Sequence, residues 1–263
     1  MRYLRLLLLF ARAEAQQELA YRTNFVASLL EALLRVATGV AGIAVIFSHV
    51  EQVRGWEFAS TLAVLGVYLS LDALRGLVIE PSFEALAGEG GDIHTGRFDF
   101  TLLKPVDAQF LSSVKRWQLF SVLDLGVGLG VAGTAISLMG GIPSPGQVIG
   151  FLVALCVGFT LLYAVVLACS SLVFWVPEVY FTWIFDSIFQ LARFPVGLYP
   201  GWLRLLLTWV IPVGVMTTIP AEALAGRLSV ATLIGAGFLA VISVGLASWL
   251  FRAGLRRYTS ASS

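Results

Sequence analysis

Six stretches of about 20 or more mostly apolar residues follow one another along this chain of 263 residues. A helix needs about 20 such residues to cross the hydrocarbon core of a bilayer. Only 13% of the residues are charged, against roughly 25% in soluble globular domains. The sequence therefore predicts an all-α integral membrane protein with six transmembrane helices. The predicted spans are residues 24–48, 57–79, 117–139, 146–174, 178–198 and 228–251.

Arginine and lysine gather near the N-terminus, between the second and third spans, and after the last span. Because these residues favour the cytoplasmic side of short loops, all three places and both termini are predicted to be cytosolic. The number of crossings must then be even. Residues 199–220, which are apolar but interrupted by prolines, are therefore predicted to form an extracellular re-entrant helical hairpin. Trp202, Trp209, Pro212 and Pro220 are expected to build an apolar extracellular cap there.

The N-terminal residues 1–22 are predicted to form an amphipathic interfacial helix. Leu4, Leu7, Leu8 and Ala11 recur at helical spacing, with arginines at other positions, which suits a helix lying along the membrane surface. A cleaved signal peptide is the alternative, but its apolar run would be shorter than the roughly 7–15 residues required. No repeat or linker divides the chain, so residues 1–263 are predicted to be a single transmembrane domain.

Several function classes find no support in the residue pattern. A net charge of +1 gives no reason to expect nucleic acid as a partner. A P-loop needs Gly-x4-Gly-Lys-Ser/Thr, and neither Lys104 nor Lys115 has that setting. His49 and His94 are predicted on opposite sides of the membrane, so they form no common metal site. The chain is predicted to be no enzyme and to hold no cofactor itself; any ATP and Mg would sit on a partner chain.

The charged segment between the second and third spans carries the most specific pattern, Thr95-Gly-Arg-Phe-Asp-Phe-Thr-Leu-Leu-Lys-Pro-Val106. It resembles the same segment of ABC type-2 transporter permeases. It is most similar to bacterial six-span permeases with Gly-x-(Leu/Phe)-Asp-(Phe/Tyr)-x-Leu-Leu-(Lys/Arg)-Pro there. Residues 194–203, 211–212, 220–224 and 254–262 are also similar, so the likeness covers essentially the whole chain. The resemblance implies the ABC type-2 exporter fold and the bacterial cytoplasmic (inner) membrane.

The resemblance further implies that residues 80–116 are a cytosolic coupling loop, whose short helix docks on a separate ATPase. Its apolar side chains would form the docking face and its charges would orient the contact. Glycine permits a sharp turn before the helix and proline ends it. The candidate docking residues are Gly96, Arg97, Phe98, Asp99, Phe100, Leu102, Leu103, Lys104 and Pro105. The alternative is a loop that folds only onto its own membrane domain.

A second candidate site is a belt of charged residues inside the spans, roughly 6–17 Å from their cytosolic ends at 1.5 Å per residue. Its members are Glu31, Arg35, Asp72, Arg75, Asp124 and Asp186. Charges in the membrane are costly, so these side chains are expected to face inward and pair. Asp124 and Asp186 have no partner on their own helix, and we expect them to meet the arginines of other spans. Such a cluster could be a cytosolic gate or a purely structural tie.

These observations favour the permease subunit of an ATP-binding-cassette transporter, with an amphipathic or lipid-like cargo that is exported. The resemblance implies two ABC ATPase subunits and a second permease copy or sister permease as partners, within the lipid bilayer. An ATP-independent secondary transporter and a structural membrane subunit are the alternatives. Inverted repeats with matching broken helices would favour a secondary transporter, and the sequence shows one broken segment without a counterpart.

Overall fold

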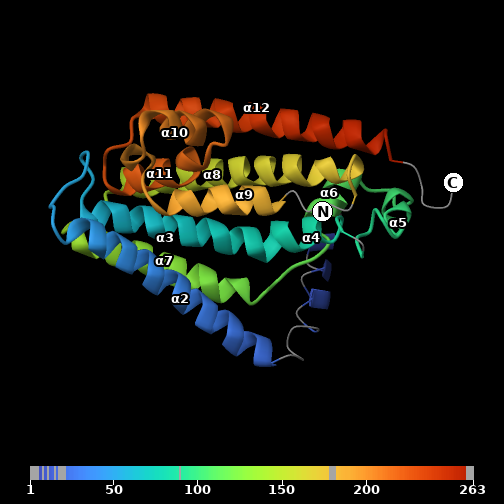
Figure 1. Ribbon diagram of the computed structural model, residues 1–263, viewed down its shortest axis with the longest axis horizontal. Coiled ribbons are helices and arrows are strands. Elements are labelled where there is room, and N and C mark those ends of the chain that lie inside the picture. Colours follow the sequence, from blue (N-terminus) through green and yellow to red (C-terminus); the bar gives the residue numbers. More distant parts are fainter. Residues whose placement is uncertain are drawn as a thin grey trace.

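The computed structural model describes residues 6–7, 9–10, 12–14, 16, 22–88, 90–177 and 182–258. Figure 1 shows a bundle of long helices that run side by side. Five helices are long and apolar enough to cross a membrane, or six when a bent pair near residue 211 is counted as one span. Four of the five are α2 (Arg22–Phe47), α7 (Ser121–Leu138), α8 (Pro145–Ser171) and α12 (Val230–Leu255). The fifth is α3 (Phe58–Leu74) with its continuation. The all-α membrane fold predicted from the sequence is thus confirmed.

α3 continues into two short elements and is the most buried of the five. A π-helical turn, η1 (Arg75–Ile79), leads directly into α4 (Glu80–Glu84). Gly66 of α3 lies so close to α7 that a Cβ would be 2.5 Å from the Ala132 nitrogen, and Gly128 of α7 similarly meets Ser70 of α3. These two glycines allow the two backbones to touch. Gly126 and Gly130, which have the spacing usual for such contacts, face open space instead.

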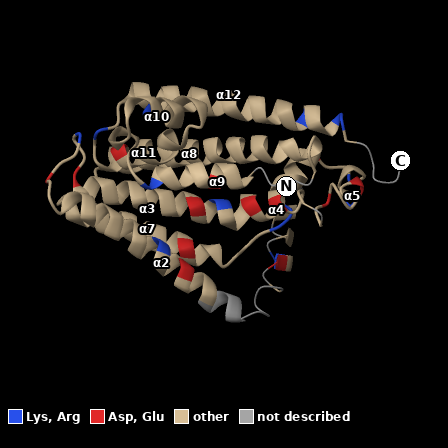
Figure 2. Cartoon of the chain, viewed as in Figure 1, with Lys and Arg blue, Asp and Glu red and all other residues tan. Residues whose placement is uncertain are grey.

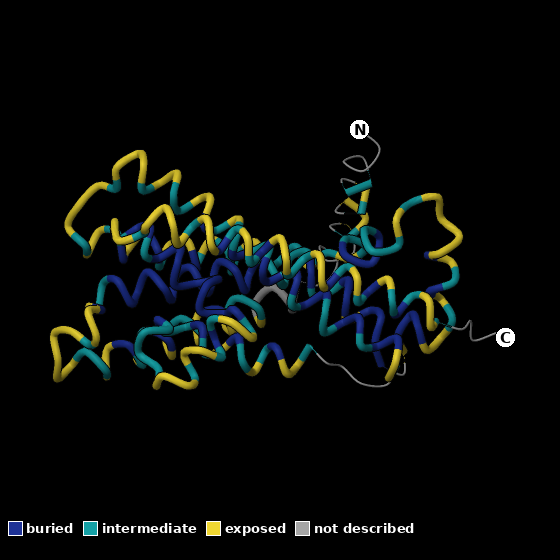
Figure 3. The backbone as a smooth tube through the Cα atoms, turned by 90° about the horizontal axis from the view of Figure 1, so that it is seen from above, coloured by how far each residue is buried: buried dark blue, intermediate teal, exposed yellow. Residues whose placement is uncertain are grey.

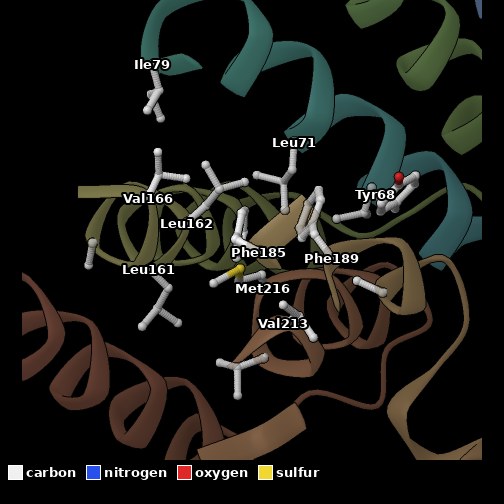
Figure 4. Packing of buried hydrophobic residues seen from close by; sticks show 14 of the residues in the cluster. Tyr68, Leu71, Ile79, Leu161, Leu162, Val166, Phe185, Phe189, Val213 and Met216 are labelled. Atoms are coloured by element: carbon white, nitrogen blue, oxygen red, sulfur yellow. The ribbon is translucent and has the colours of Figure 1, made fainter. Parts of the chain in front are cut away.

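The core lies where α3, α8, α9 (Thr182–Phe189) and α11 (Val213–Leu224) meet. Figure 4 shows Phe185 of α9 between Leu162 of α8 and Leu71 of α3, with Phe189 farther along toward Tyr68 and Met216 of α11 beneath Phe185. All six side chains are buried. The outer faces of the bundle carry exposed residues along their length (Figure 3), as helices in contact with lipid do.

The fifth predicted span, residues 178–198, is shorter as a helix than expected. Residues 178–181 lie outside the described part. From Thr182 the chain forms α9 and a 3-10 turn, η3 (Gln190–Arg193), then breaks at Phe194 and resumes as η4 (Val196–Leu198). Phe194 has extended backbone dihedrals, φ −115° and ψ 147°, because the following Pro195 disfavours the helical conformation there. The prediction of continuous helix up to residue 198 was wrong at this point.

The segment after the fifth span enters and leaves at the same end of the bundle. It comprises α10 (Gly201–Leu205), a π-helical turn η5 (Leu206–Val210) and α11, with a 92° bend between its two halves. Arg54, in the link between α2 and α3, donates hydrogen bonds to the carbonyls of Gly197 (3.1 Å) and Tyr199 (2.8 Å). Arg227 donates to the Gly55 carbonyl at 2.6 Å. Residues before and after the segment therefore meet one link, as in a re-entrant hairpin. We call this the hairpin end.

Pro220 differs from its predicted role as a breaker, because it lies buried inside α11. A helical proline leaves the carbonyl four residues earlier without its usual donor, here the carbonyl of Met216. That oxygen would lie 2.6 Å from a Cβ built on Gly158 of α8. The glycine gives room for the bulge, so α11 stays helical across its proline.

The opposite end of the bundle collects the charged loop, the link after α8 and the C-terminal residues (Figure 1). The Gly88 amide donates to the Pro177 carbonyl at 3.0 Å, which ties the loop to that link. The loop contains α5 (Asp99–Leu102) and α6 (Ala108–Val114), and the link contains η2 (Leu172–Phe174). We call this the loop end. The described residues between 6 and 16 are helical and lie beside α4, crosswise to the spans; the rest of the predicted interfacial helix, apart from Arg22 at the start of α2, lies outside the described residues.

Candidate coupling surface and intramembrane ion-pair network

The charged loop leaves the bundle through the π-helical turn η1. Pro81 has no amide hydrogen, so it cannot donate to the carbonyl of Leu77, four residues earlier. That carbonyl instead accepts the amide of Gln118 at 3.0 Å. The amide of Glu80 reaches back to the Arg75 carbonyl, which makes the wider π turn. The two ends of the loop are therefore joined by a backbone hydrogen bond where the loop begins and ends.

Asp92 holds the loop together from inside. Its side chain is 3% exposed and accepts Arg97 Nε at 3.1 Å and Lys115 Nζ at 2.8 Å. Its own amide donates to the Ala85 carbonyl, and its carbonyl accepts the Phe98 amide, both at 2.8 Å. Gly96, with φ +72°, makes the turn just before α5 in a conformation that favours glycine. The predicted sharp turn at Gly96 is present in the structure.

Phe98 corrects the sequence expectation, which placed it on the exposed apolar face of the loop. It is fully buried. Its ring packs edge-on against Phe174 of η2 and against Tyr258, with centroids 5.7 and 5.3 Å away. A residue in this place cannot touch a partner protein. It fixes α5 to the end of α8 and to the C-terminal residues after α12.

The exposed tip of the loop consists of Phe100, Leu102 and Leu103, with Lys104 and Pro105 following. Phe100 is 68% exposed and Leu103 is 80% exposed. Asp99 is half-buried and interacts with Tyr258, and burial together with this carboxylate raises the pKa of Tyr258 to about 12. These large apolar side chains lie beyond the ends of the spans. In the isolated chain they are exposed to water. Such a patch is typical of a protein–protein contact.

A polar cluster joins α6 to the bundle behind the tip. Gln109 Nε2 donates to Tyr163 Oη of α8 at 3.1 Å and to Ser248 Oγ of α12 at 3.0 Å. Ser113 Oγ lies 2.9 Å from the same tyrosine hydroxyl. The cluster therefore joins α6 to both α8 and α12 by side-chain hydrogen bonds.

Arg35 of α2 is the first centre of the charge belt. Its Nη1 lies 2.8 Å from Asp72 Oδ2 of α3, and its Nη2 lies 3.6 Å from Asp124 Oδ2 of α7. The structure thus brings Asp124, which has no partner on its own helix, to an arginine of another span. Figure 2 shows these charges on neighbouring helices that are otherwise uncharged over most of their length.

Arg75 is the second centre, and Asp72 joins the two. Asp72 Oδ1 lies 3.1 Å from Arg75 Nη2, so this buried carboxylate is shared by both arginines. Arg75 also forms an ion pair with Asp186 of α9 and lies 3.5 Å from Glu80 Oε2. Its guanidinium carbon is 5.8 Å from the centre of the Phe189 ring, within the range of a cation–π contact. One continuous network therefore links α2, α3, α4, α7 and α9.

Glu31 is where the belt departs from expectation. Its side chain is 71% exposed. It is connected to the network by a single contact, 3.8 Å between its Oε1 and Arg35 Nη2. The prediction that it faces inward was wrong. It lies one turn nearer the start of α2, where α2 diverges from the bundle (Figure 1), so it has left the enclosed part.

The predicted cap residues occupy the hairpin end but do not cover the bundle. Trp202 and Trp209 are both largely exposed, while Pro212 is buried at the 92° bend. Between the two arms lies a mostly apolar groove of about 620 Å³, with Arg204 and Glu222 among its lining residues. The tryptophans thus line or flank an open groove in the single chain.

The comparison with protein families decides the class. A model described as ABC-2 family transporter protein matches residues 33–262. The chain belongs to this family. The match takes in the charged loop, the hairpin and every member of the network except Glu31. This ABC-2 family member is accordingly a multi-pass membrane protein and a permease subunit of an ABC transporter. Neither a curated protein nor a solved structure matches the chain.

Sequence reasoning missed three parts of these sites. Asp92 was seen only as one of many loop charges, although it anchors the loop. Glu80 was assigned to the loop, yet it pairs with Arg75 at the end of the span. The contacts of Gln109 with Tyr163 and Ser248 join segments 54 and 139 residues apart. No local periodicity signals contacts of such range.

Proposed function

We propose that this ABC-2 permease is the membrane half of an ATP-driven exporter in the bacterial cytoplasmic membrane, with both termini in the cytosol. A separate ATPase docks on the tip formed by Phe100, Leu102 and Leu103. The observation that carries the proposal is the contrast within one short helix: Phe98 is buried in the chain, whereas Phe100 and Leu103 point outward. The buried ring fixes the helix and the exposed side chains remain available for the ATPase.

Two permease domains, two copies of this chain or this chain with a sister permease, enclose the transport path between them. Two ATPase subunits, which hold ATP and Mg, dock one on each loop. When they close, they shift the loops, and the cluster around Gln109 and Tyr163 passes the shift to α8 and α12. This is rigid-body work of the kind that switches access in transporters.

An amphipathic or lipid-like cargo fits the hairpin end. The groove between the arms is mostly apolar but has a cation and a carboxylate in its lining, Arg204 and Glu222. A molecule with an apolar body and a polar head matches that combination.

The ion-pair network is the proposed gate of the path. Arg35 Nε and Arg75 Nε are buried and have no hydrogen-bond partner among the described residues. Each arginine therefore has a donor left for a different set of carboxylates when the helices shift. A structural tie would be expected to use all its buried donors.

The docking proposal is tested by placing a carboxylate on the tip. Leu103→Asp and Phe100→Asp are compared with Ile142→Asp, a matched control at the opposite end, where Ile142 is 98% exposed. The tagged permease is purified in mild detergent from cells that express its transporter, and the co-purified ATPase and its ATP hydrolysis are measured. Each tip variant should lower the recovered ATPase about tenfold, equivalent to about 1.4 kcal/mol, and the control should leave it unchanged.

Full recovery of ATPase with both tip variants would refute docking at this surface. Transport by the purified chain in vesicles without any ATPase would favour a secondary transporter instead. Phe98 is unsuitable for this test, because a change there disrupts the loop itself.

A further inference from the structure

A polar pocket of about 410 Å³ opens on the side of the loop, away from its apolar tip. It lies between α4, the glycine-rich turn after α4 and the first residues that lead to α7. The described N-terminal residue Glu14 lines the same pocket. None of its lining residues belongs to the exposed tip, Phe100, Leu102 and Leu103, or to the ion-pair network.

The pocket lies at one end of a helix long and apolar enough to span a membrane, and lipid headgroups surround the ends of such helices. The membrane-spanning segment that includes α3 and α4 ends at Glu84, which lines the pocket. Trp117, another lining residue, is partly buried and donates its indole N–H to the Val114 carbonyl at 2.9 Å. Tryptophans of membrane proteins are enriched at this level. The described N-terminal residues lie crosswise to the spans (Figure 1), and one of them, Glu14, lines the pocket.

Two guanidinium groups make one side of the pocket suitable for a phosphate. Arg97 is held in place by the buried Asp92, 3.1 Å from its Nε, and by the Gly90 carbonyl, to which its Nη2 donates; its Nη1 is left to face a ligand. Arg116 is fixed through its backbone, because Ser82 Oγ both accepts from its amide and donates to its carbonyl at 2.9 Å. Its own guanidinium has no ion pair or hydrogen bond within the described part of the chain. Gly90 leaves space in the lining, because no atom lies within 4 Å of a would-be Cβ there.

Two carboxylates, Glu14 and Glu84, give the pocket the opposite charge as well. Arginine binds phosphate oxygens bidentately, whereas a carboxylate accepts hydrogens from an ammonium group. A ligand that carries a phosphate and a primary ammonium a few bonds apart satisfies both halves. A purely anionic headgroup would leave the carboxylates without partners, and a trimethylammonium group has no hydrogen to donate.

We propose that this pocket binds the headgroup of phosphatidylethanolamine from the surrounding bilayer. Arg97 and Arg116 bind the phosphate. Glu84 and Glu14 accept hydrogen bonds from the ammonium group. The lipid headgroup fills the space between α4, the loop and Glu14, and it holds these parts of the chain together. The proposal does not depend on the ATPase or on the cargo.

The test uses the purified full-length chain in detergent, to which defined lipids are added. Lipid binding is followed by native mass spectrometry and by the rise in the thermal unfolding midpoint. Phosphatidylethanolamine is compared with phosphatidylglycerol, phosphatidylcholine and the soluble headgroup glycerophosphoethanolamine. The wild type should retain phosphatidylethanolamine in preference to the other three.

Substitutions at Arg116 and Glu84 test the phosphate side and the ammonium side of the pocket separately. Arg116→Gln should weaken phosphatidylethanolamine binding about tenfold, as expected for loss of one charged hydrogen-bond pair of about 1.4 kcal/mol. Arg116→Lys, which keeps the charge, should restore part of it. Glu84→Gln should reduce the preference over phosphatidylglycerol. Arg257→Gln and Glu51→Gln, exposed residues outside the pocket, serve as matched controls and should bind like the wild type.

Equal binding of phosphatidylglycerol and phosphatidylethanolamine by the wild type would overturn the proposal. So would wild-type affinity in Arg116→Gln and Glu84→Gln, provided that both elute as folded protein in gel filtration. Equally tight binding of glycerophosphoethanolamine would also overturn it, since the ligand would then be a soluble phosphate ester rather than a membrane lipid. None of these measurements involves the ATPase, so their failure leaves the docking proposal intact.

Discussion

The loop end and the hairpin end of the bundle hold their connecting segments in place in different ways. At each end the chain leaves a helix through a π-helical turn that precedes a proline: η1 before Pro81, and η5 before Pro212. The loop is then held from inside, by the buried Asp92 and the buried ring of Phe98. The hairpin is held by its buried arm α11 and, at its two ends, by the exposed Arg54 and Arg227 bound to backbone carbonyls. Buried anchors give one rigid orientation, whereas exposed clamps can be released at little cost.

The largest effect is expected from Phe98→Ala at the loop end. Removing a buried aromatic ring leaves a cavity between Phe174 and Tyr258, which should lower the free energy of unfolding by about 4 kcal/mol. Trp202→Ala at the hairpin end removes an aromatic ring of greater size that is largely exposed, and should change stability by less than about 0.5 kcal/mol. Unfolding in mixed micelles with increasing dodecyl sulfate measures both. Similar losses for the two variants would abolish the contrast between the ends.

A second large effect is expected from Asp72→Asn in the loop half of the bundle. Asparagine leaves Arg35 and Arg75 without their shared carboxylate, and breaking a buried ion pair costs about 3 kcal/mol. Glu31→Gln, at an exposed partner of the same Arg35, should cost less than about 1 kcal/mol. The same unfolding measurement tests the pair. If Asp72→Asn were as mild as Glu31→Gln, the network would contribute no more than surface charges do.

A smaller effect than those of Phe98→Ala and Asp72→Asn is expected at the two exposed arginines of the hairpin end. Arg54→Ala and Arg227→Ala each remove exposed hydrogen bonds and should each lower stability by about 1 kcal/mol. Hydrogen exchange should nevertheless rise locally in residues 197–227, because the ends of the hairpin lose their attachment to the α2–α3 link. Unchanged exchange there, with both arginines replaced, would show that the hairpin is held by its buried α11 alone.

The sequence was enough to predict the membrane class and the helical nature of the spans, because both follow from apolar length. The pairing of Asp124 and Asp186 with arginines of other helices could also be anticipated, since a lone charge in a membrane needs a partner. The burial of Phe98 could not. Phe98 and Phe100 are chemically alike and two residues apart, and only the position of Phe174 and Tyr258 in space decides which one is covered.

The exact helix ends were equally out of reach. Pro195 ends the fifth span and Pro220 does not end α11, although both are prolines in apolar surroundings. The difference depends on Gly158 in α8, which leaves room for the carbonyl that Pro220 frees. Such compensation comes from a helix some sixty residues away in the chain, and no local pattern reports it.

The hydrogen bond between the Gln118 amide and the Leu77 carbonyl joins the two ends of the charged loop at its base. A displacement of Leu103 would therefore act on the segment that follows α3 and on the segment that precedes α7, because the hydrogen bond connects the two. A displacement of the loop would therefore reach both transmembrane helices at the same level.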